Sequence, residues 1–179
     1  MTQTLSTREK LLLAARQLFW TRGYSNVSVR EITGAAGVDA ALVSRYFGGK
    51  QGLFEATLAK MPTWEALASD QDNLLKTAVE SFTQPYNAQT DIVNPYTMLL
   101  VNVIDPVMGD KIRAFVQSEL AAPLAKKIGG AQAEEKAAML LAILFGAALM
   151  RKNFQVRGLA DKAPDELRAQ IMLLGKVII

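Results

Sequence analysis

Residues 40–46 combine very small side chains with side chains that donate hydrogen bonds. Ala40, Ala41 and Ser44 are small, while Arg45 carries a guanidinium and Tyr46 a phenol. Small residues let a helix sit deep in the major groove of DNA, where a hydroxyl and a guanidinium can read base edges or hold phosphates. On a helix, this segment therefore predicts a surface that reads double-stranded DNA.

Two further positions predict contacts with phosphate groups. Ser28 and Lys50 each open an expected helix, and the unpaired N–H groups and the dipole at a helix N-terminus favour an anion. We expect Ser28, Tyr46 and Lys50 to hold phosphates of the DNA backbone. The residues expected to face the groove are Ala40, Ala41, Ser44 and Arg45.

The charge distribution also favours an anionic partner at this end of the chain. The 179 residues include 20 Lys and Arg and 17 Asp and Glu. Residues 1–60 hold eight basic and four acidic side chains, a net charge of +4, and the other 119 residues hold 12 basic and 13 acidic ones, a net charge of −1. Such a bias also fits an ordinary solvated face, so the sequence pattern has to decide.

The residue types exclude most enzyme chemistry. The chain has no Cys and no His, so it can form no disulfide framework or zinc ribbon and lacks the commonest general base. Gly48-Gly49-Lys50 is no phosphate loop, because Ser44 stands where that motif needs a Gly. The pair Glu134-Glu135 has no His or second paired carboxylate nearby. We therefore expect no enzyme activity, no metal and no cofactor.

Capping signals and apolar residues at three- and four-residue spacing predict an all-α chain of about nine helices. Ser6 with Glu9 and Ser28 with Glu31 form capping boxes, and no segment alternates as a strand would. The predicted helices span about residues 7–22, 29–36, 40–47, 50–60, 64–85 (as one or two), 94–104, 106–128 (which can bend at Pro123), 134–156 and 164–177.

The second and third predicted helices form a helix-turn-helix at about residues 28–47. Gly37 permits the tight turn between them, as this arrangement requires. The apolar residues expected to lock the two helices against the first are Ile32, Ala36, Val38, Val43 and Phe47. We divide the chain into a DNA-binding domain at 1–50 and a second helical domain at 51–179.

Residues 7–54 resemble the DNA-binding domain of tetracycline-repressor-type transcriptional regulators. The matching residues are LLAARQLF at 12–19, RGY at 22–24, VSVREI at 27–32, AAGV at 35–38, YFGGK at 46–50 and LF at 53–54. The resemblance implies a C-terminal helical domain that binds a small effector. It also implies a homodimer, in which the last two long helices, here 134–156 and 164–177, pair with their copies in a four-helix bundle.

We therefore expect a DNA-binding regulator, most simply a repressor that a small apolar or aromatic effector releases from its operator. The alternative is an all-helical small-molecule binding or scaffold protein with a vestigial helix-turn-helix. The candidate effector contacts are aromatic and Met residues, each of which also fits a core position, and two amides on apolar helices that need partners if buried. They are Trp64, Phe82, Tyr86, Met98, Asn102, Phe115, Gln117 and Phe145.

The dimer is expected on the two C-terminal helices, which are apolar over more than one face. The residues chosen for its interface are Leu141, Leu144, Phe145, Ala148, Leu167, Ile171 and Leu174. The most apolar run, residues 137–150, is 14 residues long, whereas a membrane span needs roughly 20. Residues 1–7 lack the pattern of a signal peptide. We therefore expect a cytoplasmic protein with no membrane partner.

Overall fold

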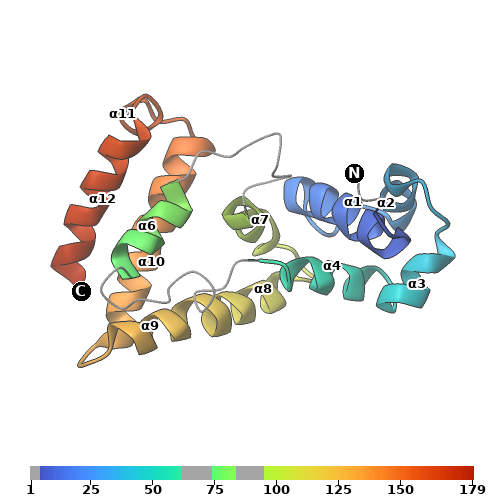
Figure 1. Cartoon of the computed structure of the whole chain (residues 1–179), viewed down its shortest axis with the longest axis horizontal. Coiled ribbons are helices and arrows are strands. Elements are labelled where there is room, and N and C mark those ends of the chain that lie inside the picture. Colours follow the sequence, from blue (N-terminus) through green and yellow to red (C-terminus); the bar gives the residue numbers. More distant parts are fainter. Residues whose placement is uncertain (1–4, 62–73, 84–94) are drawn as a thin grey trace. The chain divides into compact units, whose positions relative to one another are not determined.

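The computed structural model describes residues 5–61, 74–83 and 95–179, and every regular element among them is helical (Figure 1). The prediction of an all-α chain is confirmed for these residues. The chain divides into two compact units, one of residues 1–61 with 86–112 and one of residues 62–85 with 113–179.

The first unit contains the expected N-terminal helices. They are α1 (Thr7–Arg22), α2 (Val29–Ala36), α3 (Ala41–Phe47) and α4 (Lys50–Leu58). The same unit holds α7 (Pro95–Asn102) and the beginning of α8 (Gly109–Phe115). Both predicted capping boxes are present, at Ser6 with Glu9 and at Ser28 with Glu31.

An aromatic cluster joins α4 to α1 and to the turn that follows α1. The rings of Phe19 and Phe54 lie 5.3 Å apart, and the Tyr24 ring lies 5.6 Å from Phe19 and 5.3 Å from Phe54. Behind them, the indole N–H of Trp20 donates to the hydroxyl of Thr57 at 3.2 Å. The compact unit therefore extends past residue 50, where the sequence suggested a domain boundary, because the aromatic side chains of α1 are buried against α4.

Polar contacts that we call the clasp join α7 and the turn after it to the end of α1. Asn102 is fully buried, and its side-chain oxygen accepts from the backbone N–H of Tyr24 at 2.8 Å. Its amide nitrogen donates to the carbonyl of Phe19 at 3.1 Å. Asp105 accepts from the backbone N–H of Ser25 at 2.9 Å. The clasp thus provides acceptors for the N–H groups of Tyr24 and Ser25 and a second donor to the Phe19 carbonyl, which also accepts from the N–H of Gly23.

The second unit is a bundle in which α10 packs on α9 and α12 packs on α6 (Figure 1). Its elements are α6 (Leu74–Thr83), the π-helical turn η2 (Val116–Ala121), α9 (Ala122–Ile128), α10 (Ala133–Lys152), α11 (Arg157–Ala160) and α12 (Pro164–Ile178). The helix expected over 106–128 begins at Gly109 and is interrupted by η2, which ends two residues before Pro123. Proline has no N–H to donate to the helix. The helix expected to reach residue 156 ends at Lys152.

Candidate nucleic-acid interface

The α2–α3 turn has the geometry that the sequence predicted. Gly37 lies in the left-handed region at φ 66°, and the N–H of Val38 donates to the carbonyl of Thr33 at 3.0 Å. Ile32 and Val43 are buried beneath the turn, while Ala36, Val38 and Phe47 are half-buried. The two helices are therefore held together as a helix-turn-helix.

The outer face of α3 is exposed and consists of the residues chosen from the sequence. The side chains on this face are Ala40, Ala41, Ser44, Arg45 and Tyr46. Asp39 caps the helix, since its carboxylate accepts from the N–H of Ala41 at 2.7 Å. An exposed helix with small residues in its first turn and a guanidinium in its last turn has the shape and charge to enter the major groove.

The α3–α4 junction is compact and leaves the first turn of α4 without a side-chain cap. Gly48 and Gly49 both have positive φ, at 73° and 119°. No side chain caps the N-terminus of α4, so the N–H groups of its first turn remain available to an anion. Only glycine fits at position 52, because the Cβ of any other residue would overlap the carbonyl of Phe47.

Lys50 lies at the predicted place but does not extend away from the protein. Its ammonium sits 4.1 Å from the centre of the Tyr24 ring, a cation–π contact. Burial there lowers the pKa of Lys50 below its ordinary value. To reach a phosphate, the side chain has to leave Tyr24, whereas the backbone N–H of Lys50 at the start of α4 needs no such movement.

Ser28 differs from its prediction, because both of its hydrogen-bond donors are used inside the protein. Its backbone N–H and its hydroxyl each donate to the Glu31 carboxylate at 2.8 Å. These bonds, with a further one from Arg22, lower the pKa of Glu31 to about 2. Ser28 is therefore a helix cap, and the negative charge of Glu31 already occupies the N-terminus of α2, where a phosphate was expected.

Sequence reasoning missed two basic residues near the helix-turn-helix. The guanidinium of Arg8, on α1, lies 5.1 Å from the centre of the Phe47 ring at the end of α3. Arg30 is exposed in the first turn of α2. Both were counted in the basic balance of residues 1–60, but only the fold shows that Arg8 lies beside α3.

The candidate effector residues do not gather at one place. Trp64 and Tyr86 lie outside the described residues. Met98 and Asn102 are fully buried in the first unit, and both the N–H groups and the oxygen of Asn102 are engaged by backbone atoms. Asn102 is therefore a structural residue of the clasp, which corrects its assignment to an effector site.

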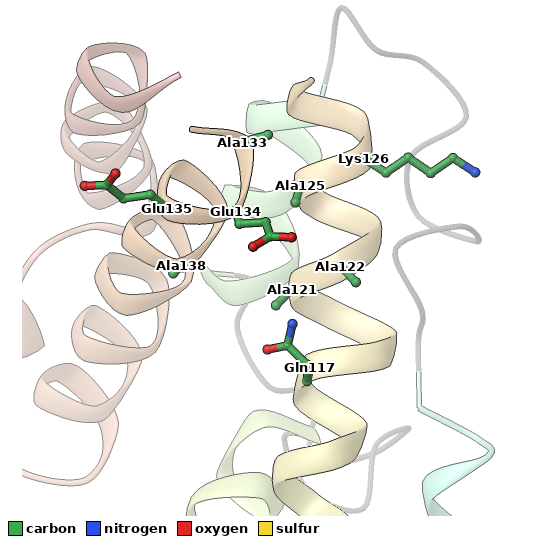
Figure 2. Close-up of a pocket in the computed structure, with 9 residues that line it drawn as sticks. All are labelled: Gln117, Ala121, Ala122, Ala125, Lys126, Ala133, Glu134, Glu135 and Ala138. Atoms are coloured by element: carbon green, nitrogen blue, oxygen red, sulfur yellow. The ribbon is translucent and has the colours of Figure 1, made fainter. Parts of the chain in front are cut away.

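Three other candidates belong to the second unit. The rings of Phe82 on α6 and Phe145 on α10 meet edge to face at 5.1 Å. Phe115 is half-buried and Gln117 is exposed. Gln117 borders an open groove of about 650 Å³ between the η2–α9 segment and the start of α10 (Figure 2). Its floor is mostly alanine, and Glu134 points across it, whereas Lys126 points away.

The residues expected at a dimer interface are mostly buried within the protomer. Leu141, Leu144, Leu167 and Ile171 are at most 6% exposed and form the core of the second unit, which corrects their assignment. Phe145 and Ala148 are half-buried, and Leu174 is 53% exposed. The large apolar side chains that α10 and α12 do expose are Met139, Met150, Leu173, Leu174 and Val177.

An exposed recognition helix on a helix-turn-helix, with an uncapped helix N-terminus beside it, defines a class of DNA-binding proteins. Residues 11–57 match the bacterial regulatory proteins of the tetR family, and residues 66–174 match the tetracyclin repressor-like C-terminal domain. The chain belongs to the TetR family, whose members are DNA-binding transcriptional regulators and not enzymes.

Individual relatives agree with this assignment. The HTH-type transcriptional regulator YttP of Bacillus subtilis is 34% identical over 94 residues, which cover 46% of this chain and 45% of YttP, less than half of that relative. A TetR-family regulator from Streptomyces coelicolor shares the fold with a TM-score of 0.60 at 24% identity, covering 96% of this chain and 93% of the other. NalD of Pseudomonas aeruginosa, a repressor of a multidrug efflux pump, gives 0.66 at 20% identity, with 94% and 95% covered.

The described part of the chain holds neither a membrane-spanning helix nor a cluster of metal ligands. None of the helices described there is both long and apolar enough to cross a membrane. No three acidic side chains in residues 5–61, 74–83 and 95–179 come together as a metal site would require.

Proposed function

We propose that this protein is a repressor that binds an operator through α3 and the N-terminus of α4. The observation that supports this most is the exposed outer face of α3, where Ala40, Ala41, Ser44 and Arg45 leave room for base edges and offer two donors. Tyr46 and the first turn of α4 would hold the flanking phosphates. Because its target is bacterial DNA, we place the protein in the cytoplasm.

The experiment starts by selecting bound sites from random double-stranded DNA. Arg45→Ala is expected to lower affinity for the selected site by about 1–3 kcal/mol and to relax the preference at one base pair. If the Lys50 ammonium leaves Tyr24 to bind a phosphate, Lys50→Ala should weaken all sequences alike and lower the salt slope by about one unit. Lys126→Ala, an exposed lysine of α9, is the matched control and should change neither. If the protein shows no salt-dependent binding to DNA, the result would favour a small-molecule binding or scaffold protein with a vestigial helix-turn-helix.

An effector would release the protein from DNA by acting on two sets of contacts within the DNA-binding unit, those of α4 and those of the clasp. The inner residues of α4, Leu53, Phe54, Thr57 and Leu58, are buried against the unit, so α4 moves with it. The clasp attaches α7 to the end of α1. We expect a small apolar or aromatic effector to shift these helices and to weaken DNA binding by about 1–3 kcal/mol of coupling, which is reciprocal. Equal effector affinity in the free and DNA-bound protein would refute the release.

The homodimer is part of this proposal, because two half-sites are read together when the recognition helices lie about 34–36 Å apart. The exposed apolar side chains of α10 and α12 support it. Leu173 is 67% exposed, Val177 83% and Met139 53%. Large apolar side chains gathered on neighbouring helices are typical of a protein–protein interface. We therefore assign the dimer surface to these side chains instead of the buried leucines chosen from the sequence.

A further inference from the structure

The inward side of α10 changes from apolar to cationic in its last turn. Ala137, Leu140, Leu141 and Leu144 are buried along this helix. Because residues seven apart lie two turns apart on one side of a helix, Arg151 continues the line of Leu144, and Lys152 continues the line of Phe145. Two positive charges therefore stand where the pattern of the helix calls for apolar side chains.

Both cations have buried nitrogen atoms that have no hydrogen-bond partner among the described residues. One terminal nitrogen of Arg151 donates to the carbonyl of Lys162 at 2.9 Å, but the other, Nη1, is buried and unpaired. The Nζ of Lys152 is also buried and unpaired. Burial, followed by the neighbouring charge of Arg151, lowers the pKa of Lys152. Basic residues at the end of a helix are ordinarily solvated, as exposed Lys126 is at the end of α9, so the helix dipole alone does not account for this pair.

The free donors suit a carboxylate. A buried cation is unfavourable unless a charge and hydrogen bonds compensate it, and only an anion compensates two cations. The Arg151 Nη1 and the Lys152 ammonium offer donors from two side chains, so each can bind one oxygen of a carboxylate. Two turns away, about 10 Å along the axis, Phe145 meets Phe82 of α6.

We propose that Arg151 and Lys152 bind the carboxylate of an effector whose apolar body lies along α10 toward Phe145 and Phe82. This inference rests on the proposed function, because it names the chemical class of the effector. It predicts an amphipathic organic acid and excludes a cationic or uncharged ligand of the same shape at this place.

The test compares octanoate with 1-octanol on the intact protein, by calorimetry and by thermal melting. Octanoate is expected to bind wild type at least tenfold more tightly than octanol does, and to raise its melting temperature. Lys152→Met should lose at least tenfold in octanoate affinity, whereas Lys126→Met should bind as wild type does. Without octanoate, Lys152→Met should melt no lower than wild type, because the uncompensated buried charge has been removed.

Several outcomes would overturn the proposal. These are no binding of octanoate to wild type, equal binding of octanoate and octanol, and unchanged binding by Lys152→Met. A large fall in the melting temperature of ligand-free Lys152→Met would also overturn it, because the charge would then be held within the chain. The comparison of octanoate with octanol needs only the wild type, so it decides even if a variant fails to fold.

DNA release is measured separately, on a site selected from random DNA. Lys152-dependent octanoate binding without release would leave the anion site standing and refute effector release. Release of DNA by octanol, with no dependence on Lys152, would support effector release and refute the anion site.

Discussion

Glu31 stabilises the start of α2 only while its carboxylate is charged. The carboxylate accepts from the backbone and hydroxyl of Ser28 and pairs with Arg22 at 2.8 Å. These bonds lower its pKa from 4.5 to about 2. A folded pKa below the ordinary value means that this stabilisation is complete above the ordinary pKa and is lost as the pH falls toward the folded one.

The pH dependence of a Glu31→Gln variant tests this contribution. The variant should be less stable than wild type near neutral pH, because Gln cannot supply the charged acceptor, and the difference should shrink between about pH 4.5 and pH 2. Urea unfolding at several pH values measures it. Glu135→Gln, at an exposed position on α10, serves as the control. A difference that stays constant with pH would show that the charge contributes nothing.

Asn102 provides a second test at the scale of one residue. Asn102→Leu keeps the approximate size but leaves the N–H of Tyr24 unpaired and buried, whereas the carbonyl of Phe19 keeps its bond from the N–H of Gly23. An unpaired buried group costs about 1–3 kcal/mol, so the free energy of unfolding should fall by about 1–3 kcal/mol in urea melts. Gln117→Leu, the exposed amide, should change it by less than about 0.5 kcal/mol. Similar effects of the two substitutions would show that the clasp is not stabilising.

At the scale of the helices, the sequence could predict the features that depend on residues close together in the chain. The capping boxes of α1 and α2 and the glycine turn between α2 and α3 each depend on residues within a few positions of one another, and all are present. The outer face of α3 follows from the same local spacing. These features need no knowledge of the rest of the fold.

Long-range packing decides the features that the sequence could not predict. Asn102 meets Tyr24 across 78 positions of the chain, so neither residue signals the other. The placement of Leu141 and Leu144 of α10 at a dimer interface was wrong for a different reason. The helix is apolar on nearly all sides, and periodicity cannot tell its inner side from its outer side. Ser28 was predicted both to cap α2 and to bind a phosphate. The two roles need the same donors, the backbone N–H and the hydroxyl of Ser28, and in the structure both donors bind Glu31.

The α3–α4 junction is the element whose geometry should be least tolerant of change. Gly52→Ala places a methyl group against the Phe47 carbonyl, so the junction has to open and α3 has to shift. We expect lower stability and at least tenfold weaker binding to a selected DNA site, since displaced contacts each contribute about 1–3 kcal/mol. Gly34→Ala, within α2 with open space around it, should instead raise stability by about 0.5–1 kcal/mol. If Gly52→Ala bound DNA normally, the junction would not position α3.

For the whole molecule, we expect the oligomeric state to depend on the exposed apolar surface of the second unit. The double variant Leu173→Glu with Leu174→Glu should be monomeric at micromolar concentration, because charges are costly inside an apolar interface. Sedimentation velocity measures the state. Ile104→Glu, at a residue 86% exposed in the first unit, is the matched control and should stay dimeric. A wild-type monomer, or a double variant that still dimerises, would contradict the assigned surface.

The clasp also has a consequence for the order of events during synthesis. The helix-turn-helix is complete by residue 47, yet its compact unit needs Asn102 and Asp105. A nascent chain that ends at residue 61 would leave the Tyr24 N–H without its partner and the α7-facing side of α1 uncovered. The unit that contains the helix-turn-helix therefore reaches full stability only after α7 has been synthesised. By then more than half of the chain has been translated. Short translation products are expected to be protease-sensitive and poor competitors for the operator.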